Sequence, residues 1–239
     1  MSDKQSSTIY TLRVHRSGGA EGAPTEFRVP VNSRHTRVLD LLLHARQHDD
    51  PRLAFRFSCR VGMCGSCAVN VNGREMLACQ TAVGSLGTNS IDVRPLRALP
   101  ARKDVVSDMT PFFASMKKAR AALVPKDPDL REVKVLPPGE KRRAAIERQN
   151  GCITCGACYS ACEWTRSHEG YLGPAALNRL YMLAQDERDA LGAERLETAA
   201  AADGVLRCHT VGNCSAVCPV DIPVKEGLQR LKGLINKML

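Results

Sequence analysis

The chain has 239 residues, a length that allows one large domain or two modest ones with buried cores. Its eleven cysteines are an odd number, which argues against a closed disulfide framework, and only 4% of its residues are aromatic, so bound cofactors would have to add stability to the cores. The formal net charge of +9 would suit a nucleic-acid partner, but no basic strip interleaved with aromatic residues accompanies it, so we expect no nucleic acid.

The sequence carries no recognisable targeting or membrane-spanning segment. Met1–Thr8 is polar and contains Asp3 but no arginine, which is unlike a secretory signal or a transit peptide. No stretch approaches the length of a membrane span. We therefore expect a protein of a reducing compartment, either cytosolic or peripheral to a membrane.

The N-terminal part has the pattern of a sheet protein. Alternation of apolar and polar residues predicts strands at Ile9–Arg16 and Glu26–Val31, with a glycine-rich turn at Gly18–Gly22 between them. A helix with many apolar residues is predicted over Thr36–His48, and it is ended by Asp50-Pro51.

A second hairpin is predicted within Ala68–Cys79, with strands at Val69–Val71 and Glu75–Leu77. The intervening Asn72-Gly73 favours a tight hairpin turn because both residues tolerate positive φ. Ile91–Val93 is predicted to be a closing strand. Prolines at 95 and 100 then mark a predicted domain boundary, which divides the chain into residues 1–104 and 105–239.

The C-terminal part has a helical pattern. Thr110 and Pro111 suit the start of a helix that we expect to reach Leu123. Four prolines in Pro125–Gly139 predict an extended connection. Further helices are expected at Glu140–Gln149, Pro174–Glu187, Ala193–Ala202 and Pro223–Met238.

The first cysteine motif that we consider has the spacing C-x2-C-x2-C-x3-C, and it consists of Cys152, Cys155, Cys158 and Cys162. This is the ligand run of a bacterial-type iron–sulfur cluster. A thiolate at every third residue lets one tight turn present three sulfurs to one inorganic core. The fourth cysteine of such a run usually ligates a neighbouring cluster, so the motif predicts a partner run elsewhere.

The partner run matches the same template at Cys208, Cys214, Cys218 and Pro219. It departs at one place, because Val211 stands where the second cysteine should be. If the last cysteine of each run serves the other cluster, one site receives a full set for a [4Fe–4S] cluster: Cys152, Cys155, Cys158 and Cys218.

The other site then receives three thiolates, from Cys162, Cys208 and Cys214. Three ligands suit a [3Fe–4S] core, in which the iron that would face residue 211 is absent. The alternative is a [4Fe–4S] cluster with one ligand that is not cysteine.

The remaining cysteines lie in the N-terminal part: Cys59, Cys64, Cys67 and Cys79. Their C-x4-C-x2-C spacing is that of a plant-type [2Fe–2S] cluster. Gly62 and Gly65 lie inside the loop, where a backbone curled around a cluster needs positive φ and can direct N–H groups at the sulfurs. The alternative is a zinc site, but zinc sites favour paired C-x2-C ligands, and only Cys64 and Cys67 form such a pair.

Three clusters of different type would carry single electrons in series, and at about −2 each they would reduce the net charge from +9 to about +3. No catalytic nucleophile, phosphate loop or G-x-G-x-x-G motif is recognisable, so substrate chemistry should lie on a partner subunit. The rival class is an iron–sulfur sensor or nucleic-acid binder, for which one cluster usually suffices. Five histidines are scattered and are interpreted as surface or hydrogen-bonded residues: His15, His35, His44, His48 and His168.

Three segments resemble the iron–sulfur subunits of the succinate dehydrogenase/fumarate reductase family: Ser58–Thr81, Val105–Phe113 and Gly151–Gly227. The resemblance implies an α+β chain with an N-terminal β-grasp, plant-type ferredoxin-like domain over residues 1–104 and an all-α bacterial ferredoxin-like domain over residues 105–239. It implies electron relay between FAD in a flavoprotein subunit and quinone through [2Fe–2S], [4Fe–4S] and [3Fe–4S] clusters. It also implies membrane anchor subunits, which can carry haem, and a peripheral position on the cytoplasmic face of the bacterial inner membrane.

The sequence departs from the family pattern where the electron acceptor would lie. Members that use ubiquinone typically follow the cysteine at the Cys162 position with proline and, further on, a tryptophan pair; here Glu163 follows, and the only tryptophan is Trp164. His209 matches a family position near the quinone head group, and Lys232 lies close to a position where some members place a quinone-contacting lysine.

We therefore place Trp164, His209 and Lys232 near the quinone, each with an alternative. Trp164 would otherwise shield the cluster, His209 would donate to a cluster sulfide, and Lys232 would be solvated on the polar side of its helix. Menaquinone, ubiquinone and a thiol or heterodisulfide partner all stay open as acceptors. The alternative function is accordingly the iron–sulfur subunit of another flavin-dependent oxidoreductase with a non-quinone acceptor.

Overall fold

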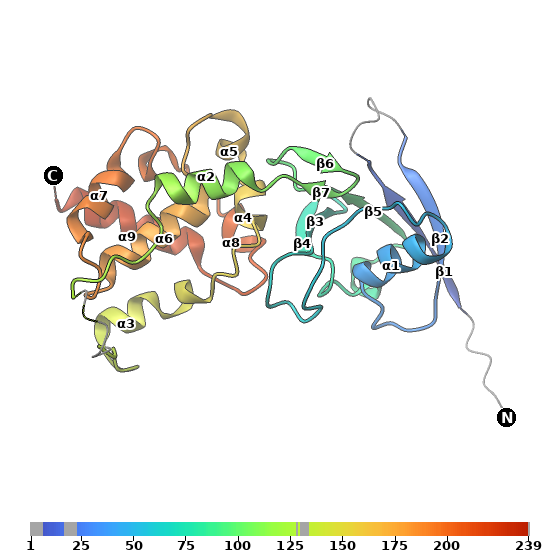
Figure 1. Ribbon diagram of the computed structural model, residues 1–239, viewed down its shortest axis with the longest axis horizontal. Coiled ribbons are helices and arrows are strands. Elements are labelled where there is room, and N and C mark those ends of the chain that lie inside the picture. The colour runs from blue at the N-terminus through green and yellow to red at the C-terminus, as the bar shows by residue number, and fades with distance from the viewer. Residues whose placement is uncertain (1–6, 17–22, 128, 130–133, 239) are drawn as a thin grey trace. The chain divides into compact units, whose positions relative to one another are not determined.

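The computed structural model describes residues 7–16, 23–127, 129 and 134–238 (Figure 1). The chain divides into two compact units. The first comprises residues up to Met109 together with Ile153–Ala157, and the second comprises Thr110–Cys152 and the residues from Cys158 onward. The turn expected at Gly18–Gly22 lies outside the described residues.

The first unit contains a mixed five-stranded sheet with the strand order β2-β1-β5-β3-β4. Its strands are β1 (Thr8–Val14), β2 (Thr25–Val31), β3 (Ala68–Val71), β4 (Arg74–Leu77) and β5 (Ser90–Arg94). Neighbouring strands are antiparallel except β1 and β5, which pair in parallel with Leu12 opposite Ile91. The β3–β4 turn has φ of 48° at Asn72 and 86° at Gly73, which confirms the predicted hairpin.

Helix α1 (Val38–His48) packs beside β2 in the same unit (Figure 1). Its buried side chains recur at three- and four-residue spacing, at Val38, Leu41, Leu42 and Ala45. Alternate residues of β2 are buried as well, whereas Pro30 is exposed; β2 tolerates this proline because it is an edge strand. A second, two-stranded sheet of β6 (Ala101–Lys103) and β7 (Val106–Ser107) was not predicted.

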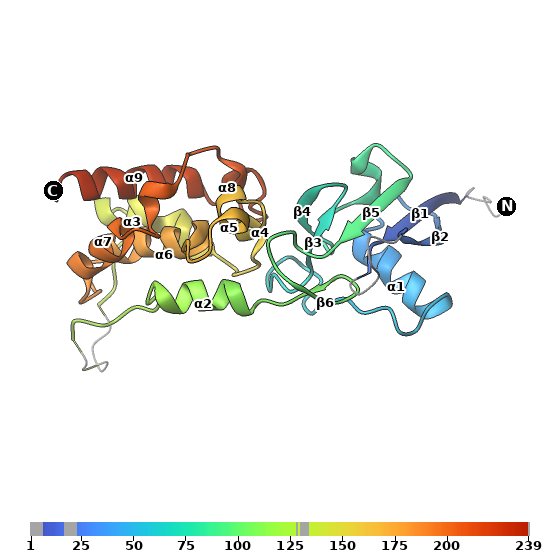
Figure 2. The ribbon, with the colours of Figure 1, turned by 90° about the horizontal axis from the view of Figure 1, so that it is seen from above.

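The second unit is built around helix α6 (Gly173–Gln185), in which ten of thirteen residues are buried. Helix α6 contacts four other helices, two of which, α2 and α9, lie on either side of it in Figure 2. These four are α2 (Thr110–Lys118), α3 (Lys141–Ile146), α7 (Gly192–Ala200) and α9 (Val224–Asn236). The three short helices α4 (Ala157–Ser160), α5 (Glu163–Ser167) and α8 (Asn213–Ala216) carry or adjoin the cysteines.

Two predicted helices differ from the observed ones by more than two residues at one end, and the others differ by one or two residues. Helix α2 stops at Lys118 rather than Leu123, because Arg120 has φ of 50° and its carbonyl accepts a hydrogen bond from the buried Arg195. Helix α3 begins after Glu140, whose carboxylate accepts hydrogen bonds from the backbone N–H groups of Arg142 at 3.0 Å and Arg143 at 2.8 Å. The helix ends at Ile146, where it passes into a 3-10 turn over Glu147–Gly151, rather than at the predicted Gln149. Across the described ranges, no helix is long and apolar enough to cross a membrane.

Candidate metal centres

The first cysteine group lies at the end of the sheet in the first unit. Cys79 lies two residues after the end of β4, and the other members lie in the loop between α1 and β3: Cys59, Cys64 and Cys67. The backbone N–H of Cys64 donates to Sγ of Cys59 at 3.3 Å, and the side-chain amide of Gln80 donates to Sγ of Cys79 at 3.7 Å. Hydrogen bonds of this kind stabilise the negative charge of a cluster-bound thiolate.

The backbone of this loop has the curl that the sequence predicts. Arg60, Gly62 and Gly65 all have positive φ, of 60°, 79° and 69°. As thiols, the cysteines differ in acidity: a side-chain hydrogen bond with Ser66, helped by hydrogen bonds with Cys59, lowers the pKa of Cys64 to about 6, whereas burial raises that of Cys67 to about 12. Cys64 is therefore more readily available as a thiolate than Cys67 is.

The two later cysteine runs share one backbone conformation. In Cys152–Gly156 and in Cys208–Gly212 the third residue is a threonine with positive φ, of 53° and 61°, and the fifth is a glycine with φ of 80° and 98°. Positive φ is rare for a β-branched residue, so its occurrence at the same step of both runs is a specific likeness. Val211 accordingly occupies in its run the place that Cys155 occupies in the other.

The predicted second group consists of Cys152, Cys155, Cys158 and Cys218. Cys152, Cys158 and Cys218 belong to the second unit, and Cys155 belongs to the segment that clusters with the first. Cys218 follows α8, and its Sγ accepts the backbone N–H of Ile222 at 3.3 Å.

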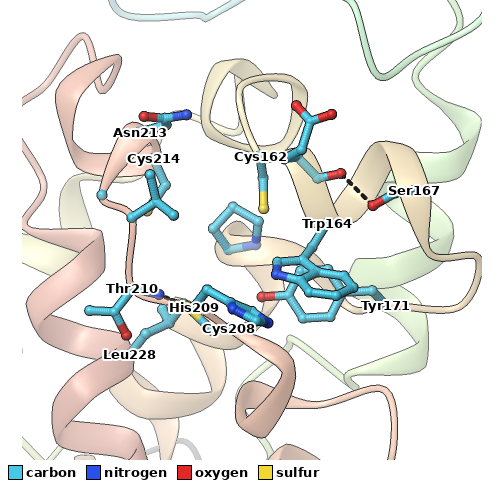
Figure 3. A pocket seen from close by; sticks show the side chains of 14 residues that line it. Cys162, Trp164, Ser167, Tyr171, Cys208, His209, Thr210, Asn213, Cys214 and Leu228 are labelled. Atoms are coloured by element: carbon cyan, nitrogen blue, oxygen red, sulfur yellow. Dashed lines mark hydrogen bonds between the residues drawn. The ribbon is translucent and has the colours of Figure 1, made fainter.

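The predicted third group lines a cavity of 340 Å³ in the second unit: Cys162, Cys208 and Cys214 (Figure 3). Cys162 caps α5, Cys208 ends a 3-10 turn, and Cys214 lies in α8. The backbone N–H of Thr210 donates to Sγ of Cys208 at 3.4 Å. Burial raises the pKa of Cys214 to about 12, and it also raises that of Cys162, so both are poor thiolates unless a cation compensates their charge.

Aromatic side chains form part of the cavity wall (Figure 3). Trp164 stacks on His209 with ring centroids 4.7 Å apart and planes at 27°, and His168 lies 3.7 Å from the same indole at 55°. His168 is thus part of an aromatic cluster and is not an isolated surface histidine as expected from the sequence. Its position four residues after Trp164, around α5, is the helical spacing that could have linked the two.

Tyr171 is a further wall residue that the sequence analysis missed. It is 3% exposed, and its pKa is raised first by burial and then by the three thiols of the third group. Val211 also lines the cavity but is 77% exposed.

Lys232 is not simply solvated, as the alternative interpretation of the sequence had it, because its ammonium group has a partner within the protein. Its Nζ donates to the carbonyl of Cys208 at 2.6 Å, and the side chain is partly buried. The apolar side of α9 is buried through Val224, Leu228, Leu231 and Ile235, whereas Met238, beyond the end of the helix, is 43% exposed. Lys232 therefore holds the loop that carries Cys208 and His209.

The donor sets fit polynuclear clusters better than they fit a disulfide framework. All eleven cysteines are free, and a backbone N–H donates to a sulfur in each of the three predicted groups. In the part of the chain that the structure describes, no three His, Cys, Asp or Glu side chains are close enough to hold a single metal ion.

Family models divide the chain in the same order as its cysteine groups. A model described as "2Fe-2S iron-sulfur cluster binding domain" matches residues 11–114, and one described as "4Fe-4S dicluster domain" matches residues 148–222. These matches define an iron–sulfur protein with a [2Fe–2S] domain followed by a dicluster domain.

Comparison with individual relatives shows to which family of iron–sulfur proteins the chain belongs. The chain is 36% identical over 211 residues to succinate dehydrogenase [ubiquinone] iron-sulfur subunit 1, mitochondrial, of Oryza sativa subsp. japonica, which covers 87% of this chain and 74% of that protein. It is 36% identical over 220 residues to the fumarate reductase iron-sulfur subunit of Mycobacterium tuberculosis, which covers 89% and 86%. A chain of the solved Mycobacterium smegmatis Sdh1 complex in the apo form superposes with a TM-score of 0.86 at 28% identity over 97% of both chains. The chain belongs to the family of iron–sulfur subunits of succinate dehydrogenase and fumarate reductase.

Proposed function

We propose that the chain relays electrons between FAD in a flavoprotein subunit and quinone, as the iron–sulfur subunit of a succinate dehydrogenase or fumarate reductase complex. The observation that carries this proposal is the presence of three separate sets of free cysteines, each with a backbone N–H directed at a sulfur, on a chain of this family. When bound, each cluster accepts and releases one electron at a time. The chain itself supplies ligands, hydrogen bonds and burial, which set the potentials.

We assign the ligands by group. The [2Fe–2S] cluster is held by Cys59, Cys64, Cys67 and Cys79. The [4Fe–4S] cluster is held by Cys152, Cys155, Cys158 and Cys218. The [3Fe–4S] cluster is held by Cys162, Cys208 and Cys214, because the position equivalent to Cys155 is Val211. The corresponding domains are a β-grasp, plant-type ferredoxin-like domain over residues 1–104 and an all-α bacterial ferredoxin-like domain over residues 105–239.

The cavity at the third group is the proposed meeting point with quinone. Trp164 and His209 offer a stacked aromatic wall beside Cys208, which suits a flat quinone head group. Lys232 acts on this site through the Cys208 carbonyl and fixes the loop that carries His209. We further propose that membrane anchor subunits complete the site and hold the chain at the cytoplasmic face of the inner membrane.

Purification of the native complex through a tag on this chain tests the proposal. We expect an FAD-containing protein to co-purify and the preparation to show succinate:quinone activity. The oxidised sample should give the EPR signal of a [3Fe–4S] core. A preparation that contains nucleic acid, or no flavoprotein, would overturn the proposed function, and a flavoprotein complex that reduces a thiol acceptor but no quinone would favour another flavin-dependent oxidoreductase.

A further inference from the structure

We propose that Gly65 is a positioning residue for electron transfer between the first and second sites, because its missing side chain lets the two ligand loops touch. The inference rests on the proposed function, since it takes Cys64, Cys67 and Cys155 to be cluster ligands. It concerns this chain's own backbone and needs no contribution from a partner subunit.

The contact is tight and involves backbone on the opposing side. Gly65 is buried and has φ of 69°. A Cβ atom placed on it would lie 2.8 Å from Cβ of Cys155, 2.9 Å from Cα of the same residue and 2.9 Å from the carbonyl oxygen of Ile153. Since two of these atoms are backbone, no rotamer change could relieve the overlap, and the loops would have to separate.

The segment around Cys155 is also held from a second direction. Ile153–Ala157 belongs to the same compact unit as the loop that contains Gly65. Gly156, next in the chain, is buried with φ of 80°, and a Cβ atom there would lie 2.9 Å from Cε of Met109 and 3.6 Å from a Cδ of Leu96. Cys155 is therefore fixed against the loop of the first site.

The contact joins two proposed ligand loops through few atoms. Gly65 lies between the ligands Cys64 and Cys67, and it touches the ligand Cys155 directly. With both clusters bound, one electron would pass from the reduced first site to the oxidised second site, or in reverse, with no bond broken and no proton moved. Such transfer slows steeply as donor and acceptor separate, so the distance that Gly65 permits bears directly on its rate.

Gly65→Ala tests this role, and the chain offers one matched control outside the cysteine loops. Gly73→Ala places the same methyl group at a positive φ, of 86°, where nothing lies within 4 Å. Both variants share the backbone strain of alanine at positive φ, and only Gly65→Ala separates the loops.

Two readouts apply to the purified complex. The magnetic interaction between the reduced first and second sites is measured as faster spin relaxation of the first-site EPR signal, and the rate of electron transfer is followed by rapid-freeze quenching. We expect Gly65→Ala to weaken the interaction and slow the transfer while the reduction potentials of both sites stay the same. Gly73→Ala should change neither the interaction nor the rate. A role confined to folding would lower the cluster content but would not change the interaction per loaded molecule.

Equal magnetic interaction in Gly65→Ala and in the wild type would overturn the positioning role. If Gly65→Ala fails to assemble, the wild-type complex decides: relaxation enhancement between the first and second sites supports the role, and its absence overturns it. Lack of the cluster signals in the wild type would instead overturn the proposed function, so the two failures are distinguishable.

Discussion

Arg195 and Asp189 form a buried ion pair in the second unit, with Nη2 2.8 Å from Oδ2 and side chains that are 2% and 0% exposed. Arg195 also donates to the carbonyls of Arg120 and Ala122, and Asp189 accepts the backbone N–H of Val124 at 3.1 Å. The pair therefore holds the chain that follows α2 against α7, and it satisfies backbone groups that no helix or strand would satisfy there.

Replacing Arg195 should destabilise the second unit strongly. Arg195→Met leaves the buried Asp189 carboxylate without its cationic partner, and the expected loss is about 3–5 kcal/mol in the free energy of unfolding. The urea midpoint of the far-ultraviolet circular dichroism of the purified chain measures it. Glu194→Gln is the control, because its pair with Arg120 is more than half exposed on both sides and should cost less than about 1 kcal/mol. Similar midpoints for the two variants would contradict the structural role of the pair.

Val211→Cys should convert the third site from [3Fe–4S] to [4Fe–4S]. The valine stands at the place of Cys155 in a repeated backbone conformation, and its 77% exposure leaves room for the exchange. The expected result is loss of the oxidised [3Fe–4S] EPR signal with one additional iron per chain by metal analysis. Val211→Ala, which adds no thiol, should keep the signal. An unchanged signal in Val211→Cys would mean that residue 211 does not face the vacant iron position.

Thiol reactivity should differ sharply among the cysteines once the clusters have been removed. Cys64, with a pKa of about 6, is mostly thiolate at pH 7, whereas Cys67 and Cys214, near 12, are thiols. Iodoacetamide should therefore alkylate Cys64 faster than Cys67 and Cys214, with a rate that rises through pH 6 and levels off above it. Peptide mass spectrometry at a series of pH values measures this.

Ser66→Ala is the matched variant for that experiment, because the hydrogen bond with Ser66 is the largest cause of the lowered pKa. We expect the rise in the Cys64 alkylation rate to move to higher pH, towards the ordinary value of 9.0, and the rate at pH 7 to fall. A pH profile that does not move in Ser66→Ala would show that another group stabilises the thiolate.

Trp164→Leu should impair quinone reduction while leaving earlier electron transfer intact. Loss of the stacked wall beside His209 should cost about 1 kcal/mol, or about fivefold in apparent quinone affinity. Succinate:quinone kinetics measure this effect, and succinate-dependent reduction of an artificial dye serves as the internal control. Trp164→Phe should recover most of the affinity. Equal losses with quinone and dye would place Trp164 in cluster assembly instead.

Local signals explain which parts of the fold were predictable. Asn72-Gly73 specifies its turn through two residues that tolerate positive φ, and the α1 stripe follows from side chains three and four apart. The parallel pairing of β1 with β5 has no such signal, because it joins Leu12 to Ile91, far apart in the chain. The end of α2 could not be predicted either, since it depends on a hydrogen bond from Arg195 to the carbonyl of Arg120, 75 residues earlier in the chain.

In the candidate sites, too, the residues set by local sequence patterns could be predicted, whereas those set by the tertiary fold could not. The cysteine spacings predicted that Cys162, Cys208 and Cys214 belong to one group, and all three line one cavity. This grouping could be predicted because each ligand run is a local sequence pattern that occurs twice. The surroundings depend on the tertiary fold. The position of Lys232 on the polar side of its helix suggests a solvated side chain, yet its Nζ donates to the carbonyl of Cys208, 24 residues earlier in the chain. Tyr171 had no periodicity or motif to set it apart from other core residues.

The segment Ile153–Ala157 has a consequence for how the protein can be divided. The chain passes from one compact unit to the other three times, after residues 109, 152 and 157. A protease that cuts only between Met109 and Thr110 would leave the two halves joined through this segment. A recombinant fragment that ends at Met109 would lack it, so Leu96 and Gly65 would lose the neighbour they pack against. The N-terminal half is thus completed by residues that are synthesised only after Thr110–Cys152 of the other half.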